Sequence, residues 1–146
     1  MTPQELLRTV KTILVIDWPS RDVPESLASA GFQVIVKGGP GPQDYSSFGL
    51  HNGEIVVRRT GRAPESADLV YFHRPLHELP GIVDTAKSLG AKAIWTQSGL
   101  SAEGVKNPAG CWLPAADLES ARTLVESAGL QYLASPYIVD ISRQLG

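Results

Sequence analysis

Residues 12–27 have the sequence TILVIDWPSRDVPESL, which predicts a strand, a tight turn and a helix in succession. The strand TILVI is short, branched and almost entirely apolar, as expected of a strand covered on both faces. Asp22 stands where it can cap the helix, with Glu25 three residues later. This unit commonly opens nucleotide-binding α/β domains. No glycine precedes Gly31, however, so the turn lacks the glycines that usually cradle phosphates.

Length and composition limit the classes of protein to which this chain can belong. The chain has 146 residues, of which 42% are apolar and 19% charged, so we expect one domain, 1–146, with a full core. A net charge of −2 gives no global field that would attract nucleic acid or an anionic membrane. No stretch approaches the roughly 20 apolar residues of a membrane span. Glu5 interrupts the short apolar run at the start, so we predict no signal peptide. Cys111 is the only cysteine, which fits a cytoplasmic location.

Strand and helix patterns alternate along the rest of the chain. Thr2, Pro3 and Glu5 predict a first helix, and apolar residues at helical spacing predict others near 79–89 and 118–128. Glycines follow the predicted helix ends, at Gly31, Gly90 and Gly129. Besides 12–16, apolar runs predict strands at 32–36, 53–59, 67–72, 91–96 and 130–134.

This alternation predicts a three-layer Rossmann-like α/β sandwich with a mostly parallel five-stranded sheet. Residues 37–52 hold four glycines and two prolines and predict an irregular loop, as do residues 97–114. In such sheets ligands bind beyond the carboxyl ends of the strands. The segments expected there are DWPSR, KGGPGP, FHRP, TQSG and SPY.

Two further stretches carry a family resemblance. They are GAKAIWTQSGLS at 90–101 and AGLQYLASPYIVDISRQLG at 128–146. Together they resemble the stand-alone CoA-binding domain proteins, which are related to the CoA-binding domain of the succinyl-CoA synthetase α subunit. That family typically has a GAKxxWxQxG stretch and a final AGL strand, and its vDlVdvFr strand is similar to ADLVYFHRP here. The family's VGAS turn after the first strand is replaced by IDWPS, Tyr137 stands where cysteine is common, and 107–114 resembles an insertion.

The resemblance and the strand ends together predict a set of ligand-binding residues. The resemblance implies that Lys37 meets the CoA nucleotide and that 96–98 contact the nucleotide or the pantetheine. The amides at the start of the second helix, with the charge of Arg21, and the guanidinium of Arg74 are predicted phosphate donors. The predicted cofactor-binding residues are Ser20, Arg21, Lys37, Gly38, Gly39, Arg74, Thr96, Gln97 and Ser98.

Each of these residues also has an ordinary structural explanation. Lys37 can be a solvated lysine at the start of a loop, and the glycines can simply make a turn. Asp17 repels anions at the opening turn, and residues 96–98 can be plain turn residues at a strand end.

Three functions follow from these patterns. The first is non-catalytic binding of CoA or an acyl-CoA at the carboxyl edge of the sheet, with a small-molecule nucleotide as ligand and a homodimer or protein partner possible. The second is a degenerate family member that serves as a protein-interaction or assembly module without nucleotide binding. The third is an enzyme using His73 or Cys111. His73 has no carboxylate or nucleophile spaced for a defined chemistry, and Cys111 has no local base or cation that would lower its pKa. The histidines are not spaced as zinc ligands, so we predict no metal site.

Overall fold

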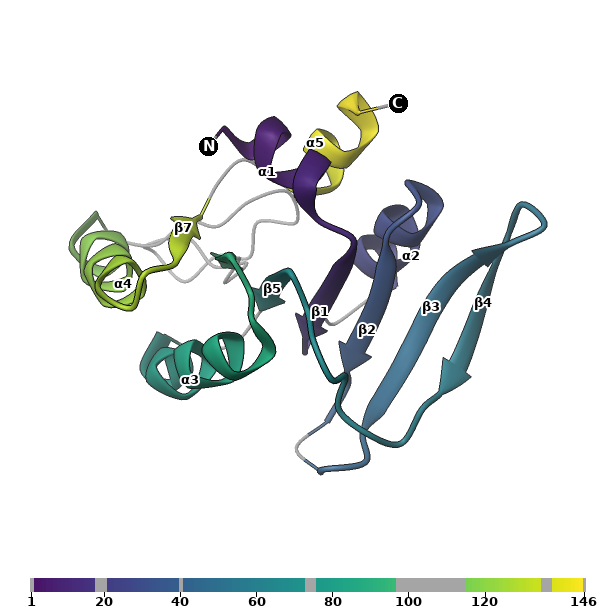
Figure 1. The fold of residues 1–146 in the computed structure, drawn as a ribbon, viewed down its shortest axis with the longest axis horizontal. Coiled ribbons are helices and arrows are strands. Elements are labelled where there is room, and N and C mark those ends of the chain that lie inside the picture. Colours follow the sequence, from purple (N-terminus) through teal and green to yellow (C-terminus); the bar gives the residue numbers. More distant parts are fainter. Residues whose placement is uncertain are drawn as a thin grey trace.

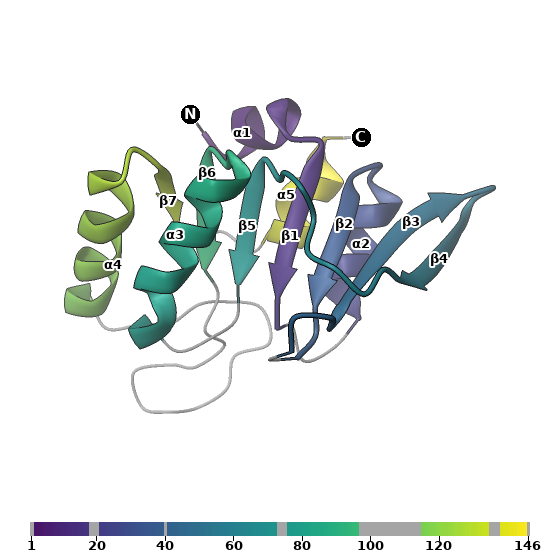
Figure 2. The same cartoon turned by 60° about the horizontal axis from the view of Figure 1, so that its bottom comes forward.

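The computed structural model describes residues 2–17, 21–39, 41–72, 76–96, 115–134 and 138–145. Within them, seven strands form one sheet in the order β4-β3-β2-β1-β5-β6-β7 (Figures 1 and 2). The strands are β1 (Thr12–Ile16), β2 (Gln33–Lys37), β3 (Tyr45–His51), β4 (Glu54–Arg59), β5 (Leu69–Phe72), β6 (Ala93–Thr96) and β7 (Gln131–Leu133). The helices are α1 (Pro3–Thr9), α2 (Asp22–Ser29), α3 (Leu79–Leu89), α4 (Ala115–Ser127) and α5 (Ile138–Gln144), with a 3-10 turn η1 (Leu76–Glu78) before α3.

The sheet has a parallel part and an antiparallel part. Strands β2, β1, β5, β6 and β7 are parallel neighbours, whereas β3 and β4 add to β2 as an antiparallel hairpin. The predicted mostly parallel α/β layout is therefore confirmed, but the predicted number of five strands is wrong, because the sheet has seven. Helices α2 and α5 cover one face, and α3 and α4 cover the other (Figure 2).

The two faces bury separate apolar clusters. Leu27, Tyr71 and Trp95 belong to the cluster under α2 and α5. Phe72 and Val83 belong to the cluster under α3 and α4. Because side chains alternate between the faces of a strand, the apolar runs of β1 and β5 contribute to both clusters. No helix of the described ranges is long and apolar enough to cross a membrane.

The first strand of the β3–β4 hairpin was not predicted from the sequence. Strand β3 lies inside residues 37–52, which we expected to be an irregular loop. Asn52 and Gly53 join the two strands with φ values of +52° and +80°, as a two-residue type I′ turn requires. Phe48 of β3 is buried against α2, so the hairpin is part of the core. The prediction of a strand near 53–59 is confirmed by β4.

The helix ends follow from local sequence with one exception. Thr2 caps α1, its side chain accepting a hydrogen bond from the Glu5 amide at 3.1 Å. After α2, Gly31 adopts a φ of +100°, and the Phe32 amide donates to the Leu27 carbonyl at 3.2 Å, which closes the helix before β2. Asp22 is not the cap we predicted, because it is the first residue of α2 and Arg21 is the N-cap.

The side chain of Asp68 links β1 and β5 at their amino ends. Its Oδ2 accepts hydrogen bonds from the Lys11 amide at 2.9 Å and the Thr12 amide at 3.0 Å. Partial burial alone would raise the pKa of Asp68. The two amide hydrogen bonds, with the positive charges of Lys92 and Lys11, outweigh burial and lower that pKa. The carboxylate thus ties the start of β1 to the start of β5.

Candidate functional site

The last residues of four neighbouring parallel strands stand in one row. Pairing joins Lys37 to Ile16, Ile16 to Phe72, and Phe72 to Thr96. With neighbouring strands about 4.8 Å apart, the row spans about 14 Å from Lys37 to Thr96. Ile16 and Phe72 belong to the cluster under α3 and α4. The side chains of the whole row therefore face α3 and α4, and we call it the carboxyl-edge row.

Thr96, at one end of the row, is buried in the core. It is 1% exposed, and its Oγ1 lies 2.8 Å from the hydroxyl oxygen of Tyr132, which is 2% exposed. The guanidinium of Arg122 lies 5.4 Å from the centre of the Tyr132 ring. The Thr96 hydroxyl therefore joins β6 to β7. Its predicted contact with a nucleotide stays a prediction.

Lys37, at the other end, brings a positive charge to the carboxyl edge. Its Nζ lies 6.0 Å from the centre of the Tyr45 ring, which packs against the cluster under α3 and α4. The Lys37 carbonyl accepts a hydrogen bond from the Asp17 amide at 2.9 Å, which ties the turn after β1 to the end of β2. The ammonium group is thus held on the α3 side of the edge by an aromatic ring.

The glycines after Lys37 surround a carboxylate. The Gly41 amide donates to Asp44 Oδ2 at 2.8 Å, and the Gly38 amide donates to the Asp44 carbonyl at 2.9 Å. A Cβ on Gly39 would stand only 2.6 Å from Asp44 Oδ2. A larger residue at position 39 would therefore displace the Asp44 carboxylate from its present position. The Gly41 amide could otherwise donate a hydrogen bond to a phosphate, but it already donates to the Asp44 carboxylate.

Asp17 opens the turn after β1 in a left-handed conformation. Its φ is +56°, a region that glycine adopts freely and that aspartate tolerates better than most residues. In the family that this chain resembles, a glycine opens this turn. The backbone shape of a glycine turn is therefore kept at this residue, while a carboxylate is added. The next residues of the turn, Trp18, Pro19 and Ser20, lie outside the described residues.

Arg21 is not brought to the carboxyl-edge row. Its Nε pairs with Glu25 Oε1 at 2.9 Å, and its guanidinium lies 5.4 Å from the centre of the Phe48 ring. Phe48 belongs to the cluster under α2 and α5, so Arg21 packs toward the opposite face of the sheet. Lys37, Gly38 and Gly39 lie together at the end of β2, three strands from Thr96. Ser20, Arg74, Gln97 and Ser98 lie outside the described residues, as do His73 and Cys111.

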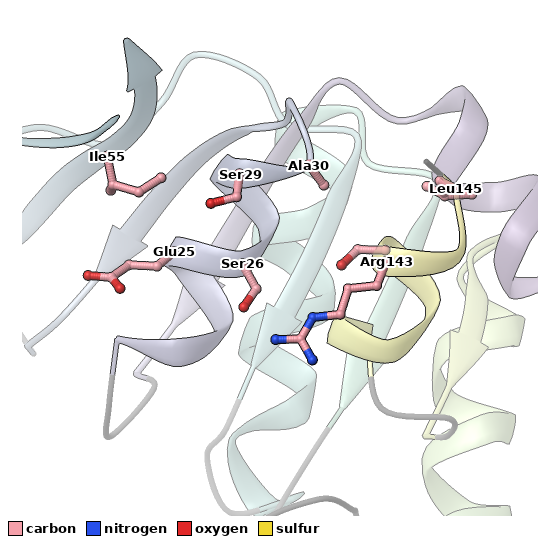
Figure 3. Close-up of a pocket in the computed structure, with 8 residues that line it drawn as sticks. Glu25, Ser26, Ser29, Ala30, Ile55, Arg143 and Leu145 are labelled. Carbon is pink, nitrogen blue, oxygen red and sulfur yellow. The ribbon is translucent and has the colours of Figure 1, made fainter. Parts of the chain in front are cut away.

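A groove lies on the α2 and α5 face. It has a volume of about 590 Å³ and opens between α2, α5 and β4 (Figure 3). Ser26 of α2 and Arg143 of α5 line it, and Glu25 beside them already pairs with Arg21. Since the carboxyl-edge row faces α3 and α4, this groove is separate from it. In the described part of the chain, no three His, Cys, Asp or Glu residues cluster to hold a metal ion.

The topology and the edge together define a class of protein. After β1, the chain adds β2, β3 and β4 on one side of β1 and then β5, β6 and β7 on the other side. The strand order therefore reverses between β1 and β5, beside Ile16 and Phe72. Parallel sheets with helices on both faces and such a switch point are Rossmann-like and bind ligands there. The sequence model of the CoA binding domain family matches residues 16–139, and the chain belongs to that family.

Solved structures support the same fold. A protein described as cell-free ID.343 from Thermus thermophilus is 21% identical, with each chain covered over its full length and a TM-score of 0.60. Prb, described as PH1109 protein redesigned for binding, is 17% identical with a TM-score of 0.61, covering 98% of this chain and 89% of its own. At these identities the likeness concerns the fold alone. No curated protein matches the sequence at a significant level.

Proposed function

We propose that this protein binds CoA or an acyl-CoA at the carboxyl edge of its sheet, without catalysing a reaction. Membership of the CoA binding domain family supports CoA-related binding. The observation that carries the location is the carboxyl-edge row, which ends the strands on both sides of the switch point. Binding without catalysis is proposed because the sequence places no nucleophile beside a base.

The described residues fit such a ligand in part. Lys37 supplies a positive charge for a phosphate at the end of β2, with Gly38 beside it. Asp44 works in the opposite direction, because its carboxylate takes the Gly41 amide and brings into the same loop a negative charge that Arg59, at 4.0 Å, offsets only in part. We therefore expect Lys37 to be the main described contact for a phosphate, and the affinity to be reduced by Asp44.

Thermal unfolding with CoA, dephospho-CoA, NAD, ATP or buffer tests this proposal. A ligand that binds only the folded protein stabilises it by roughly 2.7 kcal/mol at a hundredfold excess over its dissociation constant. We expect the midpoint to rise with CoA and not with NAD. Lys37→Met should reduce the rise. Lys87→Met, which removes the same charge from the exposed last turn of α3, should leave it unchanged.

The second candidate is an interaction or assembly module without nucleotide binding. The position of Asp44 in the glycine loop favours it, since a carboxylate already satisfies a donor there. The two candidates separate in the same experiment. A midpoint that no nucleotide moves contradicts CoA binding and favours the module, whereas a rise with CoA that needs Lys37 contradicts the module.

A further inference from the structure

Strand β4 forms the outer edge of the sheet. In Figures 1 and 2 it is the outermost element on its side, and its only strand partner in the described chain is β3. It is six residues long and contains no proline. Exposed edges of this kind are open to pairing with another strand, and natural proteins usually blunt them with prolines, bulges, short strands or charged side chains. Of these devices β4 has only charged side chains, at Glu54, Arg58 and Arg59.

The hydrogen-bonding direction of each β4 residue follows from its pairing with β3. The Thr60 amide donates to the Tyr45 carbonyl at 3.0 Å, and these two residues are opposite each other in the ladder that pairs Ser46 with Arg59. Because bonded pairs alternate along an antiparallel ladder, Glu54, Val56 and Arg58 point their backbone groups toward β3. The backbone groups of Ile55, Val57 and Arg59 therefore point outward.

This alternation restricts how two copies of β4 could pair about a two-fold axis. Outward-pointing residues must oppose one another, so Ile55 of one copy can face Val57 of the other. In that arrangement Val56 faces its own copy on the axis, and Glu54 faces Arg58 twice. Within residues 54–58 the charges that meet are opposite and the remaining pairs are aliphatic, whereas Arg59 lies opposite Gly53 of the turn.

We propose that two copies of this chain associate through antiparallel pairing of their β4 strands. The self-complementary charge pattern singles out a second copy as the occupant, because one strand supplies both members of each ion pair. Glu54 and Arg58 are exposed, and neither has an ion-pair partner within the part of the chain that the structure describes. Val57 is 40% exposed, so its pairing with Ile55 removes apolar surface from water.

Charge reversal tests the arrangement by sedimentation velocity over a concentration series. We expect the wild-type chain to dimerise reversibly and to dissociate as salt screens the ion pairs. Glu54→Arg and Arg58→Glu each place like charges opposite each other twice, and each should raise the dissociation constant about ten-fold or more. An equimolar mixture of the two variants restores both attractions, so it should form a heterodimer.

A backbone variant gives an independent test. Val57→Pro removes an outward amide while leaving the ladder to β3 intact, so it should abolish the dimer. Val57→Thr keeps the amide and should retain it. Circular dichroism confirms that each variant is folded, and recovery of association in the mixed sample excludes unfolding as the cause. A wild-type chain that is monomeric at every concentration would overturn the proposal, as would a dimer that neither charge reversal weakens.

Discussion

Each end of the parallel strands has a carboxylate that accepts hydrogen bonding from the backbone, but the surroundings of the two carboxylates differ. Asp68 at the amino end receives the Lys11 and Thr12 amides, and positive charges stand nearby. Asp44 at the carboxyl end receives the Gly41 amide inside a glycine loop, with the Arg59 guanidinium 4.0 Å away. The first carboxylate joins two strands of the core. The second closes a loop at the edge where ligands bind in this class of fold.

The comparison shows that one interaction can serve stability at one end and restrict binding at the other. At the amino end no ligand is expected, so the bonds to Asp68 compete with nothing. At the carboxyl end the Asp44 carboxylate occupies a donor of the same kind that phosphate groups use. We therefore expect removal of Asp68 to change stability, and removal of Asp44 to change ligand affinity.

The largest effect is expected at Asp68. Asp68→Ala leaves the Lys11 and Thr12 amides without their acceptor and should lower the free energy of unfolding by about 2 kcal/mol. Asp84→Ala, on the exposed side of α3, should change it by less than about 0.5 kcal/mol. Urea unfolding of both variants checks this. Equal losses of unfolding free energy in the two variants would mean that the hydrogen bonds to Asp68 do not stabilise the fold.

The effect of Asp68 should also depend on pH. Because its pKa is lowered in the folded protein, its stabilisation is fully present above the unfolded value of about 3.9. It is then lost as the pH falls through the lower folded pKa. The difference in stability between wild type and Asp68→Ala should therefore shrink in acid. A difference that stays constant down to the folded pKa would contradict the role of the charged carboxylate.

A smaller effect is expected at the buried hydroxyl pair of the carboxyl edge. Thr96→Val leaves the Tyr132 hydroxyl without this partner and should cost about 1 to 2 kcal/mol. Tyr132→Phe should cost a similar amount, and the double variant less than their sum, because both polar groups are then gone. Calorimetry of the four proteins measures the coupling. CoA binding retained in the double variant would show that the Thr96 hydroxyl acts only in the core.

The smallest effect on stability, and the most informative for function, is expected at Asp44. Asp44→Ala frees the Gly41 amide and removes a negative charge from the loop. We expect CoA to bind about five-fold more tightly, since one hydrogen bond to an ionised group is regained. Isothermal titration measures this. Glu65→Ala removes an equal charge from the exposed segment between β4 and β5 and serves as the control. An affinity that falls in Asp44→Ala would show that the loop needs its carboxylate to hold the ligand-binding shape.

Much of the fold could be predicted from the sequence because its signals are local. The buried runs of β1 and β5 and the glycines after α2, α3 and α4 each mark their own element. Strand β3 was missed because Ser46, Ser47 and Gly49 are weak strand formers. The pair Asn52–Gly53 was the available signal for that hairpin. Helix α5 was not predicted either.

The site was less predictable because it depends on packing between distant elements. Lys37, Gly38 and Gly39 could be placed at the carboxyl edge from their position after β2. The direction of Arg21 could not, since it packs on Phe48 of the missed strand. The return of Asp44 into the glycine loop also depends on the hairpin, because the Gly38 amide continues the pairing of β2 with β3.

The central position of β1 has a consequence for the order of folding. From β1 to β4 each strand pairs with its predecessor, so this half forms through contacts that are close in sequence. Pairing of β1 with β5 instead brings together segments such as those of Thr12 and Asp68, which are 56 residues apart. Contacts of such separation require closure of a long loop and form slowly. The amino-terminal half should therefore collapse before the switch point beside Ile16 and Phe72 is completed.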